Sequence, residues 1–258
     1  MLRWYRDQVH QFGPVTATML LTRVVGWRIM DDLSNRFLRP KKECPCCGWS
    51  GRRYYSYVEV AYTATNVTCP HCDSLPRHRR FFLWLTKQYQ LKAKKGVAIV
   101  FAPERALDAV WQSTPGLRIF RADLETTRHV DVLLDLQRIP VSCNAVDLLW
   151  CHHVLEHIED DAAALKELNR ILRPDTGELV VSVPMNGVQE TSEFGFADPK
   201  NSGHWRIYGD DFADKLAASG FEVQKVDYQL SDSEAVRFGI LEDEPFYLCR
   251  KRSASVAQ

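Results

Sequence analysis

The chain has 258 residues, of which 45% are hydrophobic and 26% are charged. This length suits one large α/β domain with a small appendage, or two modest domains, and the composition excludes a collagen, a disordered tail or a coiled coil as the main body. The 33 basic and 33 acidic residues cancel, but residues 1–95 carry 17 Lys and Arg against 6 Asp and Glu, whereas residues 96–258 carry 16 against 27. This uneven division predicts two parts with different functions.

The N-terminal segment, residues 1–40, is expected to be helical and amphipathic. Four residues of this segment lie at helical spacing along one face: Leu20, Val24, Trp27 and Asp31. Two interpretations stay open for it: packing on its own domain or on a partner subunit, which we favour, or a peripheral contact with an anionic membrane surface. No secretory signal is legible and no apolar run reaches the length of a membrane span, so we expect a cytoplasmic, reducing location.

Two Cys-x-x-Cys pairs predict a metal site. Cys44 and Cys47 form the first pair, and Cys69 and Cys72 form the second. Each pair turns the backbone so that both sulfurs point the same way, and four thiolates complete a tetrahedron around Zn²⁺. The stretch Arg52–Val67 between the pairs is rich in Tyr, Val and Thr, which indicates strands. We therefore expect residues 41–78 to form a zinc ribbon with a structural zinc ion.

Cys46 is an additional thiol that competes with Cys47 as a ligand, but the spacing of Cys44-x-x-Cys47-Gly48 favours Cys47. A redox disulfide is the alternative interpretation, and it is weaker because a redox pair normally lies between a strand and a helix. A closed four-thiolate site holds a small segment folded and does no chemistry itself. Residues 79–95 are expected to form a linking helix. The three arginines at its start, Arg77, Arg79 and Arg80, either contact an anionic ligand such as phosphate or remain solvated.

From residue 96 onward, β-branched runs alternate with helical segments. The expected strands are Gly96–Phe101, Leu117–Ala122, Val130–Asp135, Ala145–Cys151, Glu178–Val183, Phe221–Tyr228 and Glu244–Arg250. The expected helices are Glu104–Gln112, Asp160–Leu172 and Asp210–Ser219, the last capped by Asp210. The second is amphipathic, with Leu165, Leu168 and Leu172 on one face and Pro174 ending it. This alternation predicts an α/β fold with a doubly wound, mostly parallel sheet over residues 96–252, followed by a flexible tail at 253–258.

Acidic residues follow two of these strands. Asp123 comes directly after the second strand, about 20 residues beyond the first, a spacing at which a carboxylate reaches a ribose diol. Asp135 closes the third strand. Each aspartate alone is also explained as a turn residue. Together they favour a nucleotide site at the carboxyl ends of the strands.

Several motifs in this half resemble one enzyme family. The runs are Asp135–Pro140, Ala145–Trp150, His153–Ile158 (HVLEHI) and Leu168–Pro174. They are similar to those of class I S-adenosylmethionine-dependent methyltransferases of type 11, over roughly residues 96–250. More narrowly, the chain resembles bacterial members with an N-terminal zinc ribbon and a later His-x-Arg-x-Tyr-Gly signature, here His204–Gly209. The resemblance implies a Rossmann-like fold, S-adenosylmethionine as cofactor and methyl transfer as activity.

The resemblance also implies a cofactor site. By position, Asp123 would bind the ribose hydroxyls, and Asp135 with Leu136 would flank the adenine. The residues Cys151, His152 and His153 would line the loop beneath the methionine part. The family usually has Gly-x-Gly in the first loop, where this chain has Ala102-Pro103-Glu104. The zinc-ribbon members are similar in this respect, so we expect a variant of the cofactor pocket.

Methyl transfer requires the protein to position the acceptor and, for a hydroxyl or amine acceptor, to take up its proton. The candidates for this base are His204, which we favour, then His153, His157 and Tyr208. His157 is also explained as a residue that shapes its loop.

Three functions remain open, and the first is our prediction: a methyltransferase for a small-molecule or glycan acceptor. The second is an RNA methyltransferase that uses the basic, zinc-bearing half to hold phosphates. The third is a non-catalytic binding module with a decayed cofactor site. The sequence leaves the oligomeric state open.

Overall fold

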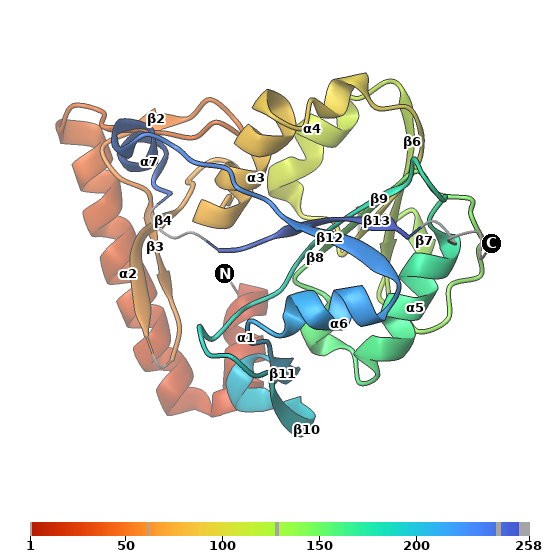
Figure 1. The fold of residues 1–258 in the computed structure, drawn as a ribbon. Helices are drawn as coiled ribbons and strands as arrows, with labels where there is room; N and C mark the ends of the chain where they lie inside the picture. Colours follow the sequence, from red (N-terminus) through yellow and green to blue (C-terminus); the bar gives the residue numbers. More distant parts are fainter. Residues whose placement is uncertain (1, 61, 127–128, 241–243, 253–258) are drawn as a thin grey trace, which may run out of the picture. The chain divides into compact units, whose positions relative to one another are not determined.

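The structure, a computed structural model, describes residues 2–60, 62–126, 129–240 and 244–252 (Figure 1). The tail expected at 253–258 lies outside the described residues. The chain forms two compact units, and neither is a continuous segment. Unit 1 comprises residues 1–89, 105–110 and 229–243, and unit 2 comprises residues 90–104, 111–228 and 244–258. Each unit is described separately below.

Unit 1 begins with two helices and continues through two short antiparallel strand pairs. Its elements are α1 (Leu2–Phe12), α2 (Pro14–Phe37), β1 (Lys42–Glu43), β2 (Ser50–Gly51), β3 (Tyr55–Val58), β4 (Thr63–Thr68), α3 (Pro76–Lys87), the 3-10 turn η2 (Arg105–Leu107) and α7 (Asp232–Phe238). β1 pairs with β2, and β3 pairs with β4. α4 (Asp108–Gln112) crosses the boundary between the units.

α2 lies within the segment expected to be helical, and one of its faces is buried. Gly13 precedes the helix at φ +81°, and Pro14 occupies the first turn, where its missing N–H costs nothing. Ala17, Leu20 and Asp31 are buried on the face that lies against β3. The carboxylate of Asp31 accepts a hydrogen bond from the backbone N–H of Ser56 (2.8 Å), which fixes the helix on the strand.

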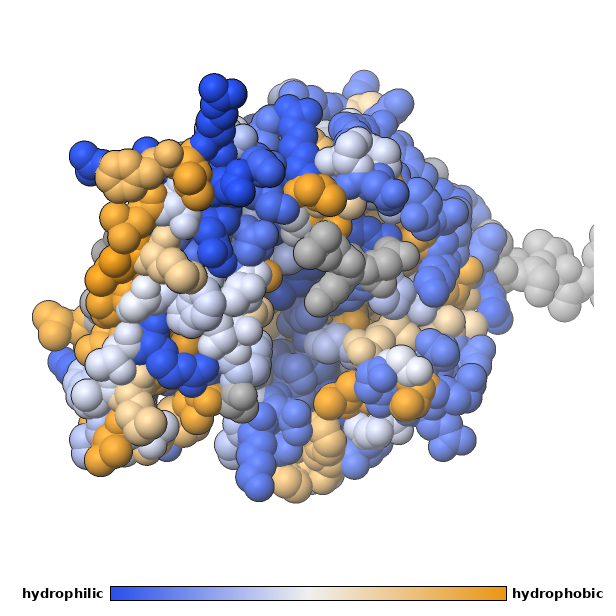
Figure 2. All heavy atoms as spheres, turned by 90° about the vertical axis from the view of Figure 1, so that its left-hand side faces the viewer, coloured by the Kyte–Doolittle hydropathy of each residue, from blue (hydrophilic) through white to orange (hydrophobic). Residues whose placement is uncertain are grey.

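The opposite face of α2 is also apolar, and it is exposed. Val15, Met19, Ile29, Leu33 and Phe37 lie on it, each with more than half of its surface accessible. Figure 2 views the molecule from the side on which Figure 1 draws α2, and hydrophobic residues gather down the left part of this view. No helix among the described residues combines the length with the apolar run that crossing a bilayer requires.

A buried arginine joins distant parts of unit 1. Arg79 is 0% exposed, and its guanidinium lies 4.0 Å from the centre of the Tyr54 ring. It donates to the carbonyl oxygens of Ser74 (2.6 Å), Phe238 (2.6 Å) and Gly239 (3.0 Å). The guanidinium thus holds the end of α7 against the segment that carries the second cysteine pair. The expected role in contacting an anionic ligand is wrong for Arg79, because its donors are engaged inside the protein.

Unit 2 is built on a seven-stranded sheet of order β12-β13-β9-β8-β5-β6-β7. The strands are β5 (Gly96–Phe101), β6 (Leu117–Asp123), β7 (Val132–Leu133), β8 (Leu148–His152), β9 (Glu178–Ser182), β12 (Phe221–Lys225) and β13 (Tyr247–Lys251). The five strands β5 to β9 are parallel, and β13 runs antiparallel between β9 and β12. This confirms the expected Rossmann-like, mostly parallel sheet.

Helices α5 (Asp161–Ile171) and α6 (Phe212–Ala218) contribute to the core of unit 2 with the sheet. α5 places Leu165, Leu168 and Ile171 in this core, as the spacing of its leucines predicts. The remaining elements are η1 (Leu91–Ala93), η3 (Leu155–His157), η4 (Pro199–Asn201) and the hairpin of β10 (Ser192–Asp198) and β11 (His204–Ile207).

Four local predictions need correction. The third strand is only β7, and the helix expected at 104–112 is a 3-10 turn followed by the five residues of α4. α6 begins after Asp211 rather than Asp210, and the carboxylate of Asp211 accepts from Thr191 (2.6 Å) instead of capping the helix. The strand expected at Ala145–Cys151 begins later, as β8 (Leu148–His152).

Candidate functional site

A cavity of about 180 Å³ opens where β5, β6 and β8 end. Its lining is Phe101, Ala102, Ala122, Asp123, Leu124, Leu134, Leu136, His153, Val154, His157 and Ile158. β5 pairs with β6 on one side and with β8 on the other, so the order of the strands reverses at this point. Ligands of open α/β sheets bind in crevices at such reversals. The cavity is therefore the candidate functional site of unit 2.

Ala102 forms the first turn beside this cavity. Its backbone φ is +45°, in the left-handed region that glycine enters without steric cost, and its N–H donates to the carbonyl oxygen of Ala122 (2.9 Å). The loop after β5 thus makes a left-handed turn although it lacks the usual glycines. Holding an alanine there costs about 1 kcal/mol or more, so the surrounding contacts must enforce it.

The two aspartates singled out from the sequence differ in position. Asp123 lines the cavity, and its Oδ1 accepts the N–H of Leu124 (2.7 Å), which orients the carboxylate at the end of β6. Asp135 is exposed and does not line the cavity; its Oδ1 accepts the N–H of Gln137 (2.9 Å) in a tight turn. The neighbouring Leu136 does line the cavity.

Four other expected cofactor residues are absent from the described lining: Pro103, Glu104, Cys151 and His152. Cys151 is 1% exposed, and burial raises the pKa of its thiol. His152 is buried beneath the site, where its Nδ1 pairs with Ser182 Oγ and its Nε2 lies 3.6 Å from Glu104 Oε2. The expected contacts of these residues with the cavity are therefore not seen in the described lining.

His153 lies at the edge of the cavity between two carboxylates. Its backbone is also left-handed, with φ +53°. Its Nδ1 is 3.3 Å from Glu156 Oε1, and its Nε2 contacts Glu244 Oε1. Burial by itself lowers the pKa of His153, but the nearby carboxylates of Glu156 and Glu244 outweigh this effect and raise the pKa to about 9. His153 is therefore protonated at neutral pH.

Arg206 holds the β10–β11 hairpin against η3. It is 4% exposed and donates to the backbone oxygens of Ile158 and Glu159, the latter at 2.7 Å, while its Nε pairs with Glu193 (2.9 Å). This fixes His204, two residues earlier, beside η3. The His204 and His157 rings pack edge to face, with centroids 4.7 Å apart. Burial lowers the pKa of His204.

Tyr208, the last candidate base, is 0% exposed and is not among the cavity-lining residues. Its hydroxyl donates to Asp161 Oδ2 (2.8 Å) in the first turn of α5. Burial raises its pKa, and the negative charge of Asp161 raises it further. Tyr208 thus fixes the hairpin to α5, whereas His153 and His157 reach the cavity and His204 adjoins it.

In the sequence, Glu156 is distinguished only as part of the motif His153–Ile158. Its side chain is fully buried, and neither carboxylate oxygen accepts a hydrogen bond from a described residue. Its carboxylate lies in one group with His157 and His204, with the potential ligand atoms within 4.8 Å of one another. The spacing Glu156-His157 was visible in the sequence, but the contribution of His204 depends on the hairpin.

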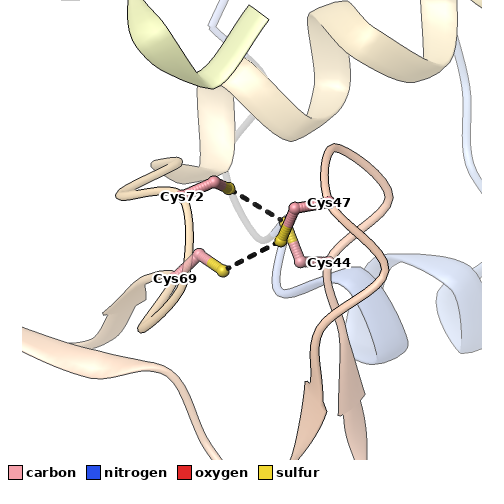
Figure 3. A group of neighbouring side chains, drawn as sticks. All are labelled: Cys44, Cys47, Cys69 and Cys72. Carbon is pink, nitrogen blue, oxygen red and sulfur yellow. Dashed lines mark hydrogen bonds between the residues drawn. The ribbon is translucent and has the colours of Figure 1, made fainter. Parts of the chain in front are cut away.

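In unit 1, the four cysteines Cys44, Cys47, Cys69 and Cys72 converge (Figure 3). The sulfurs of Cys44 and Cys72 are 3.6 Å apart, as are those of Cys47 and Cys69. Cys46 is outside this group, and its sulfur is directed at the carbonyl oxygen of His78 (3.8 Å). The loops after β1 and β4 each supply one pair of thiols.

Residues 103–181 match a family model described as a methyltransferase domain. These residues run from the loop after β5 into β9. Over these residues the chain carries a methyltransferase domain.

Solved structures similar to this methyltransferase have low sequence identity. An S-adenosylmethionine-dependent methyltransferase from Mesorhizobium loti is 12% identical, with TM-score 0.48, covering 66% of this chain and 97% of its own. A 1,6-didemethyltoxoflavin-N1-methyltransferase from Burkholderia thailandensis is 17% identical, with TM-score 0.45 and coverages of 64% and 76%. The YcgJ protein from Bacillus subtilis is 13% identical, with TM-score 0.44 and coverages of 62% and 93%. These TM-scores are too low to carry an argument about function. A comparison with curated protein sequences finds no match.

Proposed function

We propose that this methyltransferase acts on a small-molecule or glycan acceptor, which binds at the carboxyl-end cavity of unit 2. The observation that carries the proposal is the placement of Asp123 on one side of this cavity and of His157, with His204 packed on it, on another. One side thus suits a ribose and the other suits a polar acceptor. S-adenosylmethionine supplies the activated methyl group, so the protein's task is to bind and orient.

For the cofactor, we propose that Asp123 accepts hydrogen bonds from the ribose hydroxyls. Its carboxylate lines the cavity and is already oriented by the N–H of Leu124. Leu134 and Leu136 provide an apolar surface for the adenine, and the left-handed turn at Ala102 brings backbone close to the ligand. Asp135, by contrast, has no place in this proposal, since it is exposed outside the lining.

We further propose that the four cysteines of unit 1 hold a structural zinc ion. A tetrahedral ion with Zn–S bonds of about 2.3 Å sets its sulfurs roughly 3.8 Å apart. The two measured sulfur separations of 3.6 Å fit that geometry. Four protein ligands leave no coordination position open, so the ion would stabilise the ribbon and take no part in methyl transfer.

The alternative of an RNA acceptor has less support. It draws on the basic character of residues 1–95, but several of these cations are engaged within unit 1. Arg79 donates to buried carbonyls, Arg53 pairs with Asp31 (2.9 Å), and Arg28 lies 3.7 Å over the Tyr55 ring. Such cations are less available to neutralise phosphates than free surface residues.

The test is to incubate the protein with methyl-labelled S-adenosylmethionine and a cell extract separated into small-molecule, glycan and RNA fractions. We expect label in the small-molecule or glycan fraction and none with Asp123→Ala. Label confined to RNA, with RNA retention that falls steeply as salt rises, would support the alternative instead.

A further inference from the structure

The carboxyl group of Glu156 is buried beside a single histidine, His153. Neither of its carboxylate oxygens accepts a hydrogen bond from a described residue, and its side chain is fully buried. Its ion-pair partner, His153, is shared with Glu244. A buried carboxylate normally has hydrogen bonds or a metal ion to offset the loss of hydration. Glu156 therefore has the capacity to bind a further positive group.

Two imidazoles complete a donor set around this carboxylate. His157 is adjacent in η3, and β11 brings His204 to the same point, with ligand atoms of all three residues within 4.8 Å of one another. The edge-to-face packing of the two rings keeps their nitrogens close together. Arg206 fixes this arrangement by binding the backbone that follows η3. Two histidines and one carboxylate form a common site for divalent transition metals.

We propose that Glu156, His157 and His204 bind a divalent transition-metal cation beside the cofactor cavity. This site is separate from the four cysteines, and its donors differ: imidazole nitrogen and carboxylate oxygen rather than thiolate sulfur. Manganese, iron and zinc ions accept such mixed donors.

The position of the site indicates what the cation does. Three protein ligands leave coordination positions open, and His157 lines the cavity, so an open position is accessible from it. The role of the cation rests on the proposed function. The cation binds a hydroxyl or carboxylate oxygen of the acceptor and orients the acceptor toward the cofactor. The acceptor class narrows to oxygen-bearing molecules.

The experiment uses Mn²⁺ as the probe, with the full chain and its measured zinc content. Mn²⁺ favours oxygen and nitrogen ligands over thiolates, so the cysteines do not compete for it. Loss of the free Mn²⁺ signal in electron paramagnetic resonance counts the bound ions. The variants are Glu156→Gln, close to isosteric, and His204→Gln. The matched controls are Glu159→Gln, an exposed carboxylate three residues along, and His10→Ala, an exposed histidine of unit 1.

We expect one Mn²⁺ per chain in the wild type and in both controls, and binding weaker by about tenfold or more in Glu156→Gln and His204→Gln. S-adenosylhomocysteine binding and the unfolding temperature are measured on every variant, so a folding defect is recognised. Wild-type protein that binds no Mn²⁺, or folded variants that bind it as the wild type does, would overturn the proposal. If the methyltransferase proposal itself is wrong, the wild-type protein will not bind S-adenosylhomocysteine, and this result is independent of the Mn²⁺ measurement.

Discussion

His204 packs edge to face on His157, with ring centroids 4.7 Å apart, although 47 positions separate the two residues in the chain. One ring comes from the turn after β8 and the other from the β10–β11 hairpin. The contact brings together two histidines that the sequence identifies only as separate candidates. It places both beside the proposed methyl-transfer site, and the residues that maintain it are testable.

Arg206 is the first such residue. Replacing it with Lys keeps the charge but removes the planar fork that reaches the oxygens of Ile158, Glu159 and Glu193. Because these backbone acceptors are then unsatisfied in a buried place, we expect the free energy of unfolding to fall by about 2–3 kcal/mol. Denaturant unfolding measures this loss. The exposed Arg138→Lys serves as control, and an equal effect of both substitutions would contradict the role of Arg206.

Asp123 and Asp135 form a matched pair for the cofactor site. Both carboxylates accept a backbone N–H in a local turn, but only Asp123 lines the cavity. Asp123→Ala should weaken S-adenosylhomocysteine binding about tenfold to hundredfold, which corresponds to the loss of a charge-assisted hydrogen bond. Asp135→Ala should leave the affinity within about twofold, since a substitution away from the ligand contributes a few tenths of a kcal/mol. Calorimetric titration measures the affinity of both variants for S-adenosylhomocysteine. Equal affinities of Asp123→Ala and Asp135→Ala would disprove the role of Asp123 in cofactor binding.

The cysteine ribbon offers a similar internal control. Cys69→Ser should release the proposed zinc and reduce the cooperativity of unfolding in unit 1, because three thiolates bind the ion less tightly. Cys46→Ser should retain it, since that sulfur is directed at the His78 carbonyl. Metal content per chain is measured by mass spectrometry. Zinc retained at full stoichiometry in Cys69→Ser, or lost in Cys46→Ser, would refute the ligand set.

Arg79 provides a test of how unit 1 is held together. Arg79→Met removes a buried donor from the carbonyl oxygens of Ser74, Phe238 and Gly239, and among the described residues only the first two keep a second donor, the Cys69 N–H and the Tyr54 hydroxyl. We expect the free energy of unfolding to fall by about 3 kcal/mol. Hydrogen exchange should accelerate in α7 and β4 and remain slow in the central sheet of unit 2. Arg39→Met, at an exposed position, is the control. Unchanged protection of α7 would show that other contacts hold it.

The central sheet could be predicted because its strands are short, buried and β-branched. Glu178–Ser182 and Gly96–Phe101 end at or within one residue of their expected limits. α5 followed from its leucine spacing and from Pro174 beyond its end. Such local patterns carry their own structural signal. The cysteine spacing likewise identified the four thiols that converge.

Features that depend on distant contacts could not be predicted in this way. The segment 229–243 joins unit 1 because Arg79 reaches Phe238, 159 positions along the chain. The hairpin around His204 faces solvent. Apart from Phe194 and Phe196, its sequence shows little hydrophobic patterning. The left-handed turn at Ala102 has no sequence signal, because alanine rarely adopts it.

We propose that the cavity at the ends of β5, β6 and β8 binds the methyl-donor cofactor. The most direct measurement is isothermal titration of the full chain with S-adenosylhomocysteine. We predict one molecule bound per chain, with binding weakened in Asp123→Ala and preserved in Asp135→Ala. No heat of binding at high ligand concentration, in protein shown to be folded, would contradict the account.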